Sequence, residues 1–335
     1  YGSGFIDLVP ADGVTPAVVR GLPAKMVVRQ LSAQPASASE RLSALVAPLT
    51  LRGPLIFSFI LVFGILVGPV NLFWFARGRN RPRLFWTTPL ISFAGSAVLV
   101  VIMLMQDGTG GAGARVLLAT TLPQQKQMVV LQEQFSKTGV LLNRAFELPE
   151  HDSTWLVPLP VIHTVASAYS GSGEREEKRS YELAGQRASG GWFASRAVQG
   201  QLLQSVRLNR GGIDLQEGAS PTAISSLGTS LTRLYVMDRQ KKMWTAENVA
   251  TGQRITLSPV SREAFEAWLR SSVKTHMGGF LRAQVDAGIP AAGPWFFAEA
   301  AAPERIAVPT LNSIRWEHDR AYLIGPADAG PGTAP

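Results

Sequence analysis

The sequence predicts a membrane protein: a two-helix transmembrane hairpin, then a mainly β, sandwich-like extracytoplasmic domain with one C-terminal helix. Three observations support this fold class. Two apolar runs, 53–76 and 84–106, contain no charged residue, and each exceeds the roughly 20 residues that a helix needs to cross a bilayer. The short segment between them carries four arginines. From residue 115 onward, apolar and polar residues mostly alternate, with turn residues between the runs, as is typical of β-strands.

The composition agrees with membrane segments. Hydrophobic residues make up 46% of the chain and charged residues 17%, against the roughly 25% charged residues of soluble domains. The net charge is +8, and half of this excess equals the four clustered arginines, so the charge does not indicate a nucleic-acid partner. The chain has no cysteine, which excludes disulfides, thiol nucleophiles and cysteine metal ligands from it.

The region before the first apolar run is expected to belong to another domain. The chain starts at Tyr1 and not at Met, so we expect a piece of a longer protein, with a signal peptide or an upstream domain missing. Residues 1–36 contain two strand-like pieces and are predicted to end a truncated upstream β-rich outer domain. Residues 37–52 are predicted as a juxtamembrane segment, in which "SERLSALVAP" can form a short interfacial helix.

The two apolar runs are predicted to form transmembrane helices 1 (53–76) and 2 (84–106). The alternative is a pair of buried helices in a soluble protein, where uncharged runs of this length are rare. Because the loop 77–83 is short, the chain has to turn back and form a hairpin. By the positive-inside rule this basic loop lies in the cytoplasm and both flanks lie outside. Its side chains are also expected to contact anionic headgroups of the bilayer, a predicted partner; they are Arg77, Arg79, Arg81 and Arg83.

Small and polar residues inside the hairpin are predicted to pack its helices together. Gly64, Gly68 and Gly95 would let the two backbones approach closely. Asn71 is expected to donate an interhelical hydrogen bond. Neither run contains a charged residue, so the hairpin alone is not expected to be a transporter.

The rest of the chain is predicted to be a β-rich extracytoplasmic domain, 115–326, reached through a flexible Gly-rich linker, 107–114. Short strands at about ten-residue intervals favour an antiparallel sandwich, and "SVRLNRGGIDLQ" is predicted as one of its hairpins. Ser261 can cap a single long helix with an apolar stripe, which the pair Gly278–Gly279 can bend. Residues 327–335 are predicted as a disordered tail.

No catalytic, cofactor or metal-binding motif is recognised. His163 and His276 lie among or beside apolar residues, where structural roles are expected. The clusters 150–152 and 317–319 each combine Glu, His and Asp, and two such clusters are a conceivable metal site, although exposed loop residues are the simpler interpretation. Neither HExxH nor GxSxG occurs in the chain. We therefore predict a non-enzymatic protein without cofactors.

The stretch "GPVNLFWFARGRNRPRLFWTTPLIS" resembles the membrane hairpin of a poorly characterised family of large bacterial envelope proteins. That hairpin has a Gly-Pro-x-Asn-aromatic motif, a basic loop and a Trp-x-x-Pro motif. The matching residues here are Gly68, Pro69, Asn71, Phe73, Trp86 and Pro89. The flanks "GSGFIDLVPADG", "SLGTSLTRLYVMD" and "WFFAEA" resemble parts of the family's two outer domains. The resemblance implies a hairpin between two outer β-rich domains in the bacterial cytoplasmic membrane, and it implies no activity.

The predicted function is that of a membrane-anchored envelope protein, which presents β-rich domains outside the cytoplasmic membrane to bind proteins or polymers. Aromatic residues at strand positions, such as Trp192, Tyr235 and Trp244, can lie on a binding face, although such residues are more often in the core. One alternative is an accessory subunit of a transporter, export or envelope-assembly complex, whose hairpin packs against partner helices. Another is a membrane-tethered hydrolase that uses the His and carboxylate clusters.

Overall fold

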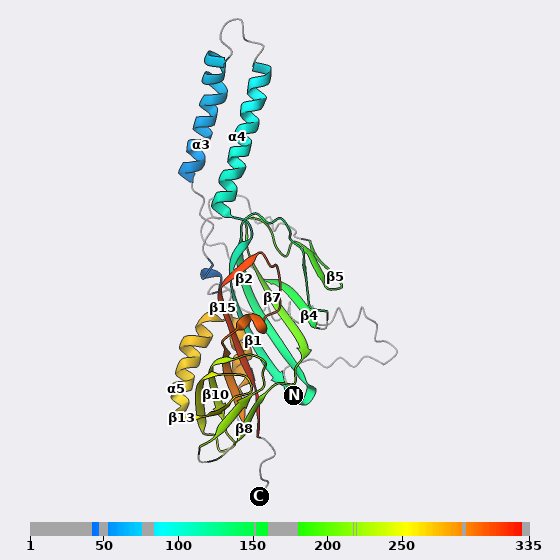
Figure 1. Cartoon of the computed structure of the whole chain (residues 1–335), viewed down its shortest axis with the longest axis vertical. Helices are drawn as coiled ribbons and strands as arrows, with labels where there is room; N and C mark the ends of the chain where they lie inside the picture. Colours follow the sequence, from blue (N-terminus) through cyan, green and yellow to red (C-terminus); the bar gives the residue numbers. More distant parts are fainter. Residues whose placement is uncertain are drawn as a thin grey trace, which may run out of the picture.

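The computed structural model is mainly β sheet, with a pair of helices projecting from one end (Figure 1). It describes residues 42–46, 53–75, 84–150, 152–159, 180–216, 218, 220–289 and 293–329. The predicted upstream domain 1–36 and the basic loop 77–83 lie outside the described residues. So do the last residues of the predicted tail, 330–335.

Helices occupy both apolar runs and end within a residue of the predicted bounds. The first run forms α3 (Gly53–Ile65), which continues as the π-helix η2 (Leu66–Phe75), and the second forms α4 (Leu84–Asp107). A helix is the natural state of such runs because it satisfies every interior backbone group without help from side chains or water. The wider turns of η2 include Pro69, which has no N–H to donate and disfavours regular α-helical geometry.

The two projecting helices contact each other at a few specific positions. The side-chain amide of Asn71 donates to the hydroxyl oxygen of Thr88 at 2.9 Å. A Cβ at Gly95 would clash with the ring of Phe63, so glycine permits this approach. Gly64 and Gly68 differ from the prediction, because among the described residues nothing lies within 4 Å of a Cβ at either position. These two glycines therefore do not pack the hairpin together.

A large twisted sheet forms the centre of the β domain. Its main strands are β1 (Gly111–Leu122), β2 (Gln127–Thr138), β4 (Ser153–Leu159), β7 (Val198–Leu208), β10 (Leu231–Met237), β11 (Met243–Val249), β13 (Ser258–Val260), β14 (Trp295–Ala300) and β15 (Ile314–Ala329). They lie in the order β13-β11-β10-β14-β15-β1-β2-β7-β4. Neighbours are antiparallel except β1 and β15, which run parallel at the centre of the sheet. The sequence had led us to expect an antiparallel sheet, and the parallel pair β1 and β15 shows that the sheet is mixed.

Two smaller groups of strands cover one face of this sheet. One consists of β8 (Ile213–Gln216), β9 (Thr222–Ser225) and β12 (Arg254–Thr256), and the other of β3 (Phe146–Glu147), β5 (Tyr181–Ala184) and β6 (Arg187–Gly190). Short 3-10 helices, η4 (Pro123–Gln125) and η7 (Pro303–Arg305), lie in two connections. Leu117, Leu203 and Phe296 of the large sheet pack in one core with Ile213 of β8 and Phe146 of β3 from this covering layer.

Two sequence predictions fail at β8. The stretch 205–216 does not form a hairpin, because β8 leaves β7 and pairs with β9 and β15. The backbone N–H of Gly211 donates to the Asn209 side chain at 3.0 Å in the intervening turn. β8 also binds the end of β15, where Ala327 is buried and opposite Ile213. Residues 327–329 are thus strand and not part of a tail.

Helices cover the other face of the large sheet (Figure 1), giving three layers where a two-layer sandwich was expected. They are α5 (Arg262–Trp268), η5 (Leu269–Val273), η6 (Lys274–His276) and α6 (Gly279–Gly288). The Ser261 hydroxyl accepts from the N–H of Ala264 at 3.1 Å, which confirms the predicted cap. The helical segment breaks at Gly278, as its glycine pair allowed. Phe265 and Trp268 pack on Phe297, in a core that the predicted apolar stripe supplies.

The short segment before the helix pair also packs on this second core. Residues 42–46 form a helical turn, with the N–H of Val46 bonded to the carbonyl of Ser43 at 3.1 Å. Leu42 is fully buried and Val46 nearly so, in the same cluster as Phe135. The described part of the predicted interfacial helix therefore lies against the β domain.

Candidate functional site

The projecting helices have almost no protein cover among the described residues. The windows Phe57–Trp74 and Leu84–Ile102, of 18 and 19 residues, are 6% and 0% buried. A core helix of a soluble protein would be mostly buried, because covering its apolar side chains is what stabilises it. Both helices are long and apolar enough to cross a membrane.

Aromatic side chains gather at the loop end of the helix pair. Trp74 and Trp86 are 81% and 83% exposed, and Phe73 and Phe85 are similarly open. Trp is enriched where a membrane meets water, since its ring is apolar and its N–H is polar. The four arginines of the basic loop follow in the sequence, outside the described residues.

The opposite end of α4 joins the sheet directly, which corrects the predicted linker 107–114. The N–H of Gly110 donates to the carbonyl of Val140 at 3.2 Å, and the N–H of Gly139 donates back to Gly110 at 2.7 Å. One residue later, the N–H of Gly111 donates to the carbonyl of Ser313 at 2.9 Å, where β1 begins. The helix and the sheet are therefore connected by hydrogen-bonded backbone.

The glycines of this junction are needed for close packing. Gly110 has φ +92°, and a Cβ there would clash with the carbonyl oxygen of Ser313. A Cβ at Gly111 or Gly113 would lie 2.6 Å from a carbonyl oxygen of β2. A glycine run of this composition looks like a flexible tether, yet each of these residues lets two backbones meet.

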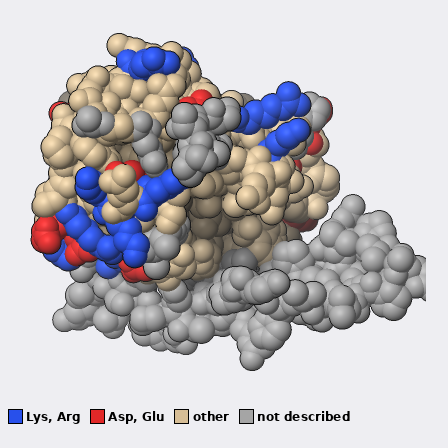
Figure 2. Space-filling model, turned by 90° about the horizontal axis from the view of Figure 1, so that it is seen from below, with Lys and Arg blue, Asp and Glu red and all other residues tan. Residues whose placement is uncertain are grey.

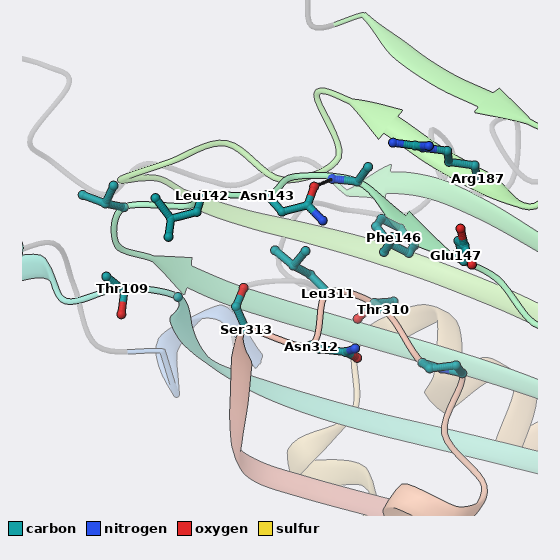
Figure 3. Close-up of a pocket in the computed structure, with 14 residues that line it drawn as sticks. Thr109, Leu142, Asn143, Phe146, Glu147, Arg187, Thr310, Leu311, Asn312 and Ser313 are labelled. Carbon is teal, nitrogen blue, oxygen red and sulfur yellow. Dashed lines mark hydrogen bonds between the residues drawn. The ribbon is translucent and has the colours of Figure 1, made fainter.

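A groove of about 800 Å³ lies beside the junction (Figure 3). Thr109 comes from the segment after α4, and Asn312 and Ser313 from the segment before β15. Glu147 of β3 and Arg187 of β6 lie opposite one another in register and line it too. Polar and apolar residues share the lining about equally, and Leu142 contributes a side chain that is 92% exposed.

Of the four histidines, the structure describes His276 and His318, and His151 and His163 lie outside the described residues. Burial lowers the pKa of His276, and the nearby charges of Arg320 and His318 act in the same direction. Across residues 42–329, leaving out the undescribed gaps, no group of three or more His, Cys, Asp or Glu is placed to hold a metal ion.

The carboxylate next to His318 has a structural partner. Asp319 accepts from the Nε of Arg115 at 2.9 Å, and the Arg115 guanidinium lies 5.1 Å from the centre of the Trp316 ring. This ion pair joins β1 to β15 and is mostly buried. Neighbouring residues of a strand point to opposite faces, so Asp319 is directed away from His318.

Glu133 on β2 is a buried titratable residue that the sequence did not single out. It is 3% exposed, and its carboxylate accepts from the N–H of Gly278 at 3.1 Å, where α6 begins. Burial raises the pKa of Glu133 to about 7, although the bond from Gly278 and the charge of Arg282 lower it. Alternation along the strand does not distinguish this Glu from the polar residues beside it.

Basic side chains gather at the end of the β domain farthest from the helix pair (Figure 2). There the turn 238–242 between β10 and β11 exposes Arg239, Lys241 and Lys242. Asp238 holds the turn in shape, because its carboxylate accepts from the N–H of Lys242 at 2.9 Å and from the indole of Trp244 at 2.8 Å. The turn presents its three cations on a well-defined backbone.

The aromatic residues considered for a binding face are mainly core residues. Trp192 and Tyr235 are each 6% exposed, and the indole N–H of Trp192 donates to the carbonyl of Glu182 at 3.1 Å. Trp244 is half-buried and held by Asp238.

No family model, curated protein or solved structure matches the chain significantly. The resemblance of its hairpin to a bacterial envelope family therefore stays a prediction.

Proposed function

We propose that the helix pair anchors this chain in a membrane, and that the β domain stands at the membrane surface to bind other proteins or envelope polymers. The observation that carries the proposal is the apolar, uncovered character of the helix pair: in the windows Phe57–Trp74 and Leu84–Ile102, only 6% and 0% of the residues are buried. In water such an exposed apolar surface would drive aggregation, whereas the hydrocarbon of a lipid bilayer solvates apolar side chains favourably.

The junction supports a positioned domain more than a freely tethered one. Backbone hydrogen bonds connect Gly110 to Val140 within three residues of the end of α4. The groove beside this junction then lies at the membrane surface, and the basic turn 238–242 points away from it. Exposed cations at the far end favour an anionic partner.

The proposed orientation follows the positive-inside rule. The loop with Arg77, Arg79, Arg81 and Arg83 lies in the cytoplasm next to anionic headgroups, and the β domain lies outside the bacterial cytoplasmic membrane. The resemblance to the envelope family points to the same arrangement.

Because the chain has no cysteine, single substitutions can test this arrangement directly. We would introduce Asn80→Cys in the basic loop and, separately, Gln240→Cys in the exposed turn of the β domain. Spheroplasts are then treated with a membrane-impermeant maleimide. Position 240 should react in intact spheroplasts and position 80 only after lysis, with both proteins in the carbonate-resistant membrane fraction.

Labelling at position 80 and not at 240 in intact spheroplasts would reverse the proposed orientation. Recovery of the chain in the carbonate-soluble fraction would reject the anchor itself.

A second candidate function is that of an accessory subunit whose helices pack against a polytopic partner. Gly64 and Gly68 favour it, since their four-residue spacing is that of helix-packing motifs and the described residues leave them uncovered. The side-chain oxygen of Asn71 is also buried without a hydrogen-bond partner in the described structure.

Replacing both Gly64 and Gly68 by Ile should abolish co-purification with such a partner in mild detergent. Ala97→Ile, which enlarges an exposed small residue of α4, should not. A strictly monomeric native particle would reject this candidate.

A further inference from the structure

One exposed apolar side chain of the β domain lies next to the helix pair. Outside the helices, only Leu142 and Leu208 among the described large hydrophobic residues are more than 80% exposed, at 92% and 82%. Leu208 ends β7 at the far end of the domain, whereas Leu142 lies in the loop 139–145 that follows β2. Figure 3 shows Leu142 and Asn143 at the groove, with Thr109 nearby.

The loop holds Leu142 in a defined position. On one side, the N–H of Val140 donates to the carbonyl of Gly108 at 3.1 Å. Leu141 is buried, and its N–H donates to the Ser195 hydroxyl at 3.1 Å. On the other side, the Asn143 side chain accepts from the N–H of Ala145 at 3.0 Å. The exposure of Leu142 is therefore built into an ordered loop.

The depth of this loop can be worked out from α4. The apolar run of α4 ends at Met105, which is 82% exposed, and Gly108 follows three residues later. With Met105 taken as the last residue in the hydrocarbon and α4 taken as perpendicular to the bilayer, a rise of about 1.5 Å per residue puts Gly108 about 4.5 Å beyond the hydrocarbon boundary. Headgroup layers are roughly 5–7 Å thick on each side of a bilayer. Since Val140 is hydrogen-bonded to Gly108, the loop lies at the depth of the headgroups.

The charge of the loop fits an anionic surface. Its only charged residue is Arg144, which is exposed and two positions from Leu142. The neighbouring turn adds Arg196, also exposed, whose N–H donates to the carbonyl of Gly139 at 2.9 Å. An apolar side chain beside cations is the combination that binds the interface of anionic membranes.

We infer that loop 139–145 is a third membrane contact, in which Leu142 enters the bilayer interface and Arg144 binds the phosphates of anionic lipids. This inference rests on the proposed membrane anchor. The contact fixes the distance of the β domain from the membrane and places the groove beside the headgroups.

Three single-cysteine proteins test the inference in the full chain. Leu142→Cys reports on the loop, Val98→Cys on the middle of α4, and Leu208→Cys is the matched exposed leucine at the far end. Each is labelled with bimane and reconstituted into two sets of phosphatidylglycerol nanodiscs, one containing lipid with a nitroxide near the headgroup and the other lipid with a nitroxide in the acyl chain. Bimane at position 142 in the first set, and at position 98 in the second set, should be quenched at least threefold more than at position 208.

If position 98 is quenched while 142 behaves like 208, the inference is wrong and the anchor stands. If position 98 is not quenched, the anchor is wrong and the inference falls with it.

The role of Arg144 has its own readout. Arg144→Gln in the labelled Leu142→Cys protein should reduce the equilibrium constant for membrane binding of the loop about fivefold in phosphatidylglycerol discs, equivalent to about 1 kcal/mol per basic residue. It should have little effect in phosphatidylcholine discs. Equal effects in both lipids would overturn the headgroup contact.

Discussion

Replacing Glu133 by Gln should remove a pH-dependent loss of stability from the β domain. Burial raises the pKa of the Glu133 carboxyl from 4.5 to about 7, against the opposing effects of Gly278 and Arg282. The folded chain therefore holds this proton more tightly than the unfolded chain. This tighter proton binding stabilises the folded state fully below a pH of about 4.5, and the stabilisation is lost as the pH rises through about 7. One pKa unit equals about 1.4 kcal/mol, so the loss amounts to about 3 kcal/mol.

The free energy of unfolding is measured by urea titration of the detergent-solubilised chain, followed by tryptophan fluorescence, at several values from about pH 4.5 to pH 8. Gln can still accept the bond from Gly278 but has no proton to lose. The variant should therefore match the wild type at the acid end and exceed it by up to about 3 kcal/mol at the alkaline end.

Glu304→Gln serves as the control, because Glu304 is an exposed glutamate of η7. It should leave the pH dependence unchanged. Identical pH profiles for wild type and Glu133→Gln would show that the buried carboxyl does not titrate in this range, and the argument from burial would fail.

Three further substitutions test other contacts. Gly110→Ala should lower the free energy of unfolding by about 1–3 kcal/mol, because the residue has φ +92° and meets a carbonyl oxygen. Asp319→Ala should remove about 3–5 kcal/mol, since it leaves the Arg115 guanidinium buried without its carboxylate. Ser261→Ala should remove about 1 kcal/mol by leaving the N–H of Ala264 without its cap. All three are measured by the same urea titration.

The substitutions at Gly110 and Asp319 each have a control in the chain. Gly212→Ala should be nearly neutral, because nothing described lies within 4 Å of a Cβ there. Glu317→Ala breaks an ion pair with Arg315, which is 80% exposed, and should cost less than about 1 kcal/mol. If Asp319→Ala is no worse than Glu317→Ala, burial does not determine the strength of the Arg115 pair. If Gly110→Ala is as mild as Gly212→Ala, the junction is looser than its hydrogen bonds indicate.

Features that depend on neighbouring residues could be predicted from the sequence. The helices over 53–75 and 84–107 need only a run without charges, since a helix satisfies its own backbone. The cap at Ser261 and the apolar stripe after it are equally local, and the structure confirms them. A strand-rich domain was also expected from the alternation after residue 115.

Pairing between distant segments could not be predicted in this way. Alternation shows that β8 is a strand, but it cannot say that β8 binds β15 in place of β7. The same holds for β1 and β15, whose parallel register brings together Arg115 and Asp319, 204 residues apart. The sequence also did not show that both faces of the large sheet are covered. The apolar helices after Ser261 pack on one face, which gives the third layer.

The sequence by itself determined the two apolar helices, the basic loop between them and the β character of the chain after residue 115, because hydropathy and periodicity are properties of neighbouring residues. Only the tertiary structure decided that the glycines after Asp107 begin a strand, that Glu133 is enclosed by the start of α6, and that Leu142 lies beside the foot of α4. These outcomes depend on which backbones and side chains meet across long stretches of chain, and the composition of a segment does not contain that information.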